Sequence, residues 1–303
     1  MNNRNLVISI LVWTIGYLKD FYRKLKEKVR IERVKKKVLD TSPVYCKDKN
    51  FIEILSVTSH DDYWKLILCV KSFFYFSKQT FPIFIVDDGT LTKQDSDLLK
   101  SHLIGCKILE RKKIEMDLSR LKNKNFLLFK NNPYVVKKIA SILYTKKDKV
   151  LFLDSDVLFF NYPDELIDWS NSQDSSIFIK DYQNAYLISD IESKYLFKVS
   201  QFSKVNSGLI GIKRNLLSLK LLNKLVNFYT LVQLFRTAQL QSYFAIIFAL
   251  AKAGNKIKTF SKRYIVPEKV EDIMYEDVVC IHYVRPVRHE YIKGAEIVLK
   301  KIT

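Results

Sequence analysis

The chain has 303 residues, of which 48% are hydrophobic and 27% are charged, so it can bury a substantial core and favours one large α/β domain with additions. Only seven glycines and six prolines occur, and no repeat or low-complexity tract is visible, which argues against solenoid and disordered proteins. The net charge of +19 calls for an anionic partner such as nucleic acid, lipid or a phosphorylated small molecule.

The N-terminal segment carries a large share of this charge. Residues 1–38 contain 11 Lys and Arg against three acidic residues, and the apolar run 6–18 is too short to span a bilayer comfortably. No small-residue cleavage site follows, which argues against a signal peptide. Helical spacing is found at Leu18, Phe21, Tyr22, Leu25, Val29 and Val34. We therefore expect residues 1–40 to form a basic amphipathic helix that binds an anionic membrane surface through residues 1–38. The alternative is a helix packed on the domain with a solvated charged face.

From residue 51 the apolar pattern alternates between strand-like and helix-like stretches, which predicts an α/β domain over residues 50–303. Residues 111–133 read as a charged, irregular segment. The alternation predicts a mostly parallel, Rossmann-like central sheet flanked by helices, in which ligands bind beyond the carboxyl ends of the strands. In chain order we expect a strand at 51–59, a helix at 60–78, a strand at 81–90, a helix at 93–103, a strand at 106–110, a helix at 133–149, strands at 149–156, 175–181, 184–189 and 204–214, a helical region at 216–254 that breaks near Arg236, and a strand at 278–286.

Two aspartates, Asp154 and Asp156, interrupt the apolar run 150–160. A buried carboxylate is costly unless its charge is compensated. On an extended segment, residues two apart leave the same face, so the two carboxylates can bind one hard divalent cation, Mg²⁺ or Mn²⁺. The alternative is that the strand ends at Leu153 and both aspartates are ordinary turn residues.

His282 lies in a short apolar strand, IHYVRP, and is followed closely by Arg285. A lone histidine of this kind is usually a satisfied core residue. It can instead supply the ligand that the aspartate pair lacks, and imidazole suits Mn²⁺ better than Mg²⁺.

Three further polar features can contact a substrate. Asp87, Asp88 and Gly89 end a predicted strand, where a carboxylate can bind a ribose or base, or simply form an Asp-Gly turn. Lys137 and Lys138 lie on the predicted helix before the aspartate pair, where either can contact a phosphate or both can lie on a solvated face. The polar break 206–208 (Asn-Ser-Gly) can bind a sugar or mark a bulge.

Taken together, the sequence resembles a glycosyltransferase of the GT-A fold, nearest to the superfamily of glycogenin and the bacterial lipopolysaccharide galactosyl- and glucosyltransferases. The resemblance covers residues 51–286, in the family's order. It rests on SVTSHDDYWKLILCVKSF, the IVDDGT turn, a lysine-bearing helix leading to KDKVLFLDSDVLFF, the VNSGLIGI strand and the late IHYVRP.

The resemblance implies roles for these positions. The metal ligands would be Asp154, Asp156 and His282, and the catalytic residues would be Asp154, Asp156 and Gln241. The nucleoside would contact Val57, Thr58, Ser59, Asp87 and Asp88. The phosphates would contact Lys137 and Arg285, and the sugar or acceptor would contact Asn206, Ser207 and Gly208. Two departures stand out. Leu240 precedes Gln241 where the family often has an acid, and HYVRPVRHEY lacks the glycine and tryptophan of the HxxGxxKPW ending. No catalytic base is evident; Asp181 and Asp190 are weak candidates.

The resemblance implies an enzyme that moves a sugar from a nucleotide-sugar donor, a UDP-sugar by preference, to a glycan or glycolipid acceptor, as in polysaccharide or lipopolysaccharide synthesis. The Lys-, Asn- and Ile-rich composition suggests a bacterial source. The implied cofactor is a divalent cation, with Mn²⁺ favoured over Mg²⁺. Four scattered cysteines suggest a reducing compartment, so we expect a peripheral protein on the cytoplasmic face of the cell membrane. The alternatives are a nucleotidyltransferase, which would usually show a Gly-rich loop, and a non-catalytic binding protein on a degenerate transferase fold. A nucleic-acid binder is not expected, because no aromatic-basic recognition motif is visible.

Overall fold

The computed structural model describes residues 3–47, 52–121, 125, 143–172, 176–184, 189–200, 204–231, 239–252 and 257–303. These residues form two compact units, Met1–Thr41 and Ser42–Thr303.

The first unit is a single helix, α1 (Asn3–Leu39). An apolar stripe along α1, made of Leu18, Phe21, Tyr22, Leu25 and Val29, is about half exposed at every position (48–58%). These residues lie three or four apart, so they share one face of the helix. Among the described residues, no helix combines the length and the apolar character that crossing a membrane requires.

The second unit holds all the remaining elements. Its helices are α2 (Tyr63–Ser77), α3 (Lys93–His102), α4 (Arg111–Ser119), α6 (Asp164–Asn171), α7 (Asp190–Phe197), α8 (Leu219–Leu231), α9 (Gln239–Lys252) and α10 (Tyr291–Ile302), with 3₁₀ turns η3 (Arg214–Leu216), η4 (Val270–Asp272) and η5 (Arg285–Glu290). Its strands are β1 (Val44–Tyr45), β2 (Ile52–Thr58), β3 (Ile83–Asp87), β4 (Leu103–Ile104), β5 (Lys107–Leu109), β6 (Lys149–Leu153), β7 (Val157–Phe159), β8 (Ser176–Lys180), β9 (Val205–Lys213), β10 (Ile257–Thr259), β11 (Tyr264–Ile265) and β12 (Cys280–His282).

Seven strands form the central sheet, in the order β10-β8-β9-β6-β2-β3-β5. Among the described strands of this sheet, only β9 runs antiparallel to its neighbours, β6 and β8, while the other adjacent pairs are parallel. A smaller sheet, β11-β12-β7, continues from the end of β6, and β1 pairs with β4. The prediction of a mostly parallel central sheet flanked by helices is therefore confirmed.

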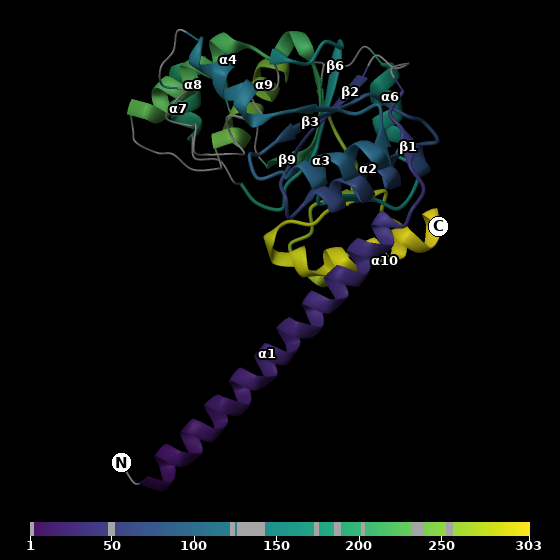
Figure 1. Ribbon diagram of the computed structural model, residues 1–303. Helices are drawn as coiled ribbons and strands as arrows, with labels where there is room; N and C mark the ends of the chain where they lie inside the picture. The colour runs from purple at the N-terminus through teal and green to yellow at the C-terminus, as the bar shows by residue number, and fades with distance from the viewer. Residues whose placement is uncertain are drawn as a thin grey trace. The chain divides into compact units, whose positions relative to one another are not determined.

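Helices cover both faces of this sheet (Figure 1). On one face, α4, α8 and α9 share a hydrophobic core with alternate residues of the strands, including Leu55, Val57, Val150 and Phe152. Elsewhere in the unit α2 contacts β2 and β7 and packs on α3 and α10. All seven residues of β2 are buried, as expected of a strand covered on both faces.

One predicted segment is corrected. We expected residues 111–133 to be charged and irregular, but Arg111–Ser119 form α4. Ile114 and Leu118 lie four residues apart and are buried, so the charged side chains occupy the rest of the helix surface. The predicted helix 133–149 and the strand 184–189 lie mostly outside the described residues.

A buried cation lies between α2 and α3. Lys71 is 3% exposed, and its Nζ lies 3.0 Å from Nδ1 of the buried His102. Burial lowers the pKa of Lys71 to about 8. The pKa of His102 is also lowered, by burial and by the charge of Lys71. Lys71 therefore holds its proton less tightly in the folded chain than in the unfolded chain.

This pair makes a pH-dependent stability prediction. At pH 7 the protonated Lys71 destabilises the fold by about 3 kcal/mol relative to its neutral form. Lys71→Met is therefore expected to stabilise the protein at pH 7, by less than this amount because the contact with His102 is lost. Because the unfolded chain binds more protons between pH 8 and 10.5, the penalty shrinks as pH rises through that window. Urea unfolding of Lys71→Met and wild type across pH 7–10.5 measures the difference, with the exposed Lys100→Met as control. A stability gap that does not change with pH would contradict the assignment.

Candidate active site

The aspartate pair lies where β6 turns into β7. Leu153 ends β6, and the amide of Val157 donates to the carbonyl of Asp154 across the turn (3.3 Å). The strand β7 then pairs antiparallel with β12, in a register that sets His282 opposite Val157. The amide of Tyr283 donates to the carbonyl of Asp156 (3.0 Å), which fixes this end of β12 against the turn. Strand pairing thus brings His282 to the aspartates across more than a hundred residues.

The three side chains form one cluster. The Nε2 atom of His282 lies 3.1 Å from Oδ1 of Asp156 and 3.9 Å from Oδ2 of Asp154. One ligand atom from each residue lies within 4.8 Å of the others. The His282 side chain is 8% exposed, and the carboxylates of Asp154 and Asp156 are 28% and 20% exposed. The site is therefore sheltered but open to solvent through the carboxylates.

The donor set fits a divalent cation. Two carboxylates and one imidazole suit Mn²⁺ or a similar transition ion, with further positions for substrate oxygens. An imidazole nitrogen and a carboxylate oxygen 3.1 Å apart repel one another unless a proton or a cation lies between them. A proton or a cation therefore has to lie between Nε2 of His282 and Oδ1 of Asp156.

Two further cations act on Asp156. Burial raises the pKa of the Asp156 carboxyl, but the opposing effects of His282, Arg288 and Lys65 prevail and leave the pKa below its usual value. Asp62 holds both cations, with Nζ of Lys65 at 2.6 Å and the guanidinium of Arg288 at 3.7 Å. The sequence alone did not identify Asp62, Lys65 or Arg288 as site residues. The arginine that this segment brings to Asp62 and Asp156 is Arg288, three residues beyond the predicted Arg285, which is exposed at the start of η5.

The segment 206–208 lies beside the cluster. The carbonyl of Gly208 accepts from the amide of Asp154 (2.8 Å). Asn206 is 2% exposed, and its Oδ1 lies 2.7 Å from Nδ1 of His282. A Cβ atom added at Gly208 would lie 2.2 Å from Cε1 of His282, so only glycine leaves room for this ring. Ser207 lies between them in β9 and is half-buried.

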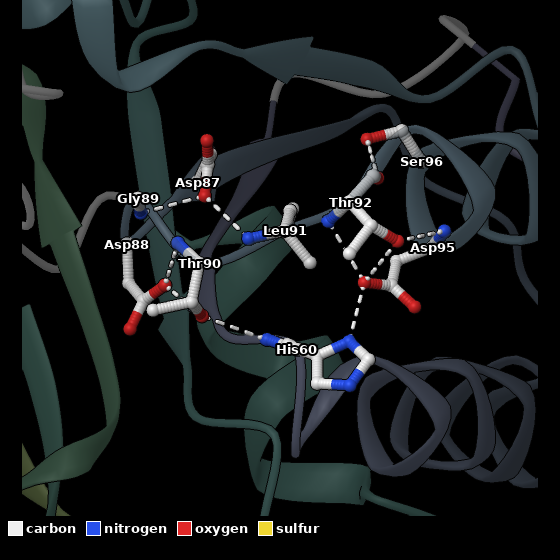
Figure 2. Close-up of polar contacts among 9 residues, drawn as sticks. All are labelled: His60, Asp87, Asp88, Gly89, Thr90, Leu91, Thr92, Asp95 and Ser96. Atoms are coloured by element: carbon white, nitrogen blue, oxygen red, sulfur yellow. Dashed lines mark hydrogen bonds and ion pairs between the residues drawn. The ribbon is translucent and has the colours of Figure 1, made fainter.

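The neighbouring strands β2 and β3 end at the same edge of the sheet. Val57 and Thr58 are buried at the end of β2, and Ser59 follows half-buried. The Oδ1 atom of Asp87 accepts from the amides of Gly89 (2.6 Å) and Leu91 (3.2 Å), and Oδ1 of Asp88 accepts from the amide and hydroxyl of Thr90 (Figure 2). Each aspartate thus uses one oxygen to fix the turn. Gly89 has φ +103°, and a Cβ there would collide with Arg111.

A histidine that the sequence reasoning did not single out follows this edge. The Nδ1 atom of His60 lies 2.7 Å from Oδ2 of Asp95, while the His60 side chain is 53% exposed and Asp95 is 4% exposed (Figure 2). The same Asp95 oxygen accepts from the amide and hydroxyl of Thr92, the N-cap of α3. Burial raises the pKa of Asp95, but its hydrogen bonds to His60 and Thr92 leave it below the usual value.

The remaining predicted residues are less informative. Lys137 lies outside the described residues, and for Gln241 only the backbone is described, within α9. Of the two weak base candidates, Asp181 is buried and bonded to Asn206 (2.9 Å). Asp190 forms an ion pair with Lys194 in the first turn of α7.

Neither a protein-family model nor a curated protein matches the sequence. Solved structures are similar in fold. The galactosyltransferase LgtC, solved in complex with donor and acceptor sugar analogues, has a TM-score of 0.53 at 13% identity, over 83% of this chain and 96% of its own. The bifunctional glycosyltransferase WbbM has a TM-score of 0.53 at 12% identity, over 86% of this chain and 52% of its own, so this chain spans about half of WbbM. The chain therefore has the fold of the GT-A glycosyltransferases, as its sequence predicts.

Proposed function

We propose that the protein is a metal-dependent glycosyltransferase that moves a sugar from a nucleotide-sugar donor, a UDP-sugar by preference, to a glycan or glycolipid acceptor. The observation that carries this proposal is the cluster of Asp154, Asp156 and His282 at the carboxyl edge of a GT-A sheet. Polysaccharide or lipopolysaccharide synthesis in a bacterium is the setting that suits such an activity.

The proposed reaction breaks the bond between the anomeric carbon and the phosphate oxygen, and the electron pair leaves with the nucleoside diphosphate. The acceptor hydroxyl oxygen forms the new bond to the anomeric carbon and releases its proton. A divalent cation held by the cluster would offset the charge that develops on the leaving group. Lys65 and Arg288, which already act on Asp156, add positive charge at the same edge.

The other residues are assigned by their place around the cluster. Val57, Thr58, Ser59, Asp87 and Asp88 follow β2 and β3, where a nucleoside would bind beyond the strand ends. Lys137 and Arg285 remain proposals for the phosphates, residues 206–208 for the sugar or acceptor, and Gln241 for a catalytic role.

A donor screen tests the activity. Purified protein is incubated with UDP-, GDP- and CMP-sugars and Mn²⁺, in the presence and absence of a glycolipid extract, and the released nucleotide is identified. We expect UDP release that a chelator abolishes. Pyrophosphate release would instead indicate a nucleotidyltransferase, and donor binding without any release would indicate a non-catalytic binding protein; either result would overturn the proposal.

We further propose that α1 binds the cytoplasmic face of an anionic membrane. The apolar stripe of α1 (Leu18, Phe21, Tyr22, Leu25 and Val29) is exposed. Beside it runs a basic stripe at helical spacing, consisting of Lys19, Arg23, Lys26, Arg30, Arg33 and Lys37. An apolar face next to a basic face matches the acyl and headgroup layers of an anionic leaflet.

Vesicle sedimentation tests the membrane partner. Wild type is expected to sediment with phosphatidylglycerol vesicles in a salt-sensitive way, and with phosphatidylcholine vesicles only weakly. The double variant Phe21→Ser, Leu25→Ser should bind at least about tenfold more weakly, because two apolar side chains no longer enter the acyl layer. A matched control removes two exposed apolar residues of α7 (Ile191→Ser, Tyr195→Ser) and should bind like wild type. Unchanged binding of the α1 variant would reject the membrane role.

A further inference from the structure

A chain of buried polar groups runs behind His282. The Nδ2 atom of Asn206 donates to Oδ2 of Asp181 (2.9 Å), and Oδ1 of Asn206 lies 2.7 Å from Nδ1 of His282. Asp181, Asn206 and His282 are 6%, 2% and 6% exposed. These contacts lie on the side of the imidazole opposite Asp154 and Asp156, which face Nε2.

The direction of these hydrogen bonds is fixed by the backbone. The amide of Gly208 donates to Oδ1 of Asn206 (2.8 Å), so this end of the Asn206 side chain must be the oxygen. Its other end then donates to the Asp181 carboxylate. Because Oδ1 can only accept, His282 must donate to it from Nδ1. The Nε2 atom is thereby left as the ligand atom of the ring.

The backbone also holds the two outer members of the chain. The amide of Asp181 donates to the carbonyl of Lys204 (2.7 Å), just after the register shift between β8 and β9. Gly208 presents only hydrogen to the face of the imidazole ring. His282 is thus confined by a hydrogen bond on one side and by strand β9 beneath it.

We propose that Asn206 and Asp181 are positioning residues that hold His282 in its Nδ1–H tautomer, so that Nε2 stays available to the divalent cation. This inference rests on the proposed metal-dependent function. It adds a role for Asn206 behind the metal ligand to the sugar or acceptor contact proposed for residues 206–208. Outer hydrogen-bond partners of this kind tune the affinity of metal-binding histidines.

The test measures metal binding and tautomer rather than turnover. Calorimetric titration with Mn²⁺ should show affinity about 10- to 100-fold weaker in Asn206→Ala and Asp181→Leu. The control Asp181→Asn introduces a side chain of the same shape as leucine but keeps an oxygen that accepts from Asn206. Its Mn²⁺ affinity should therefore fall by less than about tenfold. Nitrogen NMR of labelled histidine, with Mg²⁺ as a diamagnetic ion, reports the tautomer directly, and the chain has only four histidines.

The outcomes separate the two proposals. We expect wild type and Asp181→Asn to show Nδ1–H at His282, and Asn206→Ala and Asp181→Leu to show a mixture of tautomers. If wild type binds Mn²⁺ and every variant keeps its affinity and tautomer, the positioning role is wrong while the metal site stands. If wild type binds no Mn²⁺, the metal site itself is wrong and the positioning role falls with it. Equal losses in Asp181→Leu and Asp181→Asn, with the tautomer unchanged, would indicate a purely structural aspartate.

Discussion

Asp156→Asn is expected to slow sugar transfer by on the order of 10³-fold, because a bound metal supplies several kcal/mol of transition-state stabilisation and about 1.4 kcal/mol changes the rate tenfold. The substitution removes one of two carboxylates and leaves Nε2 of His282, now 3.1 Å from an amide, without its charged partner. Nucleotide release at saturating Mn²⁺ measures the rate, and calorimetry measures the accompanying loss of metal affinity.

The same chemical change elsewhere serves as the control. Asp168 is exposed on α6, and Asp168→Asn should keep wild-type activity and metal affinity. Thermal unfolding of both variants distinguishes a lost ligand from a lost fold. Full activity in Asp156→Asn would remove the cluster from the mechanism.

Gly208→Ala is expected to weaken Mn²⁺ binding by about 10- to 100-fold and to slow transfer accordingly, although it adds a single methyl group. The new Cβ would lie 2.2 Å from Cε1, 2.4 Å from Nδ1 and 2.7 Å from Nε2 of His282. The imidazole ring cannot move away from the new methyl group without losing its contact with Asn206 or its contact with Asp156. The methyl group is therefore expected to displace Nε2 of His282, the proposed metal ligand.

A second glycine of the same strand provides a matched control. Gly211 lies three residues further along β9, opposite Leu151 of β6, and an added Cβ there would meet the ring of Trp169 at 2.7 Å. Gly211→Ala should lower the melting temperature yet leave Mn²⁺ affinity unchanged. If Gly208→Ala loses only stability, as Gly211→Ala does, the close packing of His282 on β9 has no bearing on the metal.

Local pattern was enough to locate much of the fold and the centre of the site. The apolar strands β2, β3 and β6, each followed by polar residues, predicted a mostly parallel sheet with Asp87 and Asp154 at one edge. Asp156 and His282 were singled out because a carboxylate and an imidazole in apolar surroundings need a partner. In the structure the side chains of Asp156 and His282 contact one another.

The remaining parts depend on long-range pairing that one sequence does not reveal. The shift between β8 and β9 comes just before Asp181, which lies behind Asn206. The 3₁₀ turn η5, which follows β12, carries the Arg288 that acts on Asp156. Lys65 was not singled out from the sequence, because only folding brings it near Asp156. The helix α4 was not predicted because most of its residues are charged, and its buried apolar residues are Ile114 and Leu118.

The central claim is that Asp154, Asp156 and His282 together hold a divalent cation against the donor diphosphate. Crystals grown with Mn²⁺ and UDP, with diffraction data collected at the manganese absorption edge, test it most directly. We predict one anomalous peak bonded to both carboxylates, to Nε2 of His282 and to diphosphate oxygens. A nucleotide bound at this edge with no manganese among these three side chains, or manganese bound elsewhere with the diphosphate, would contradict the account.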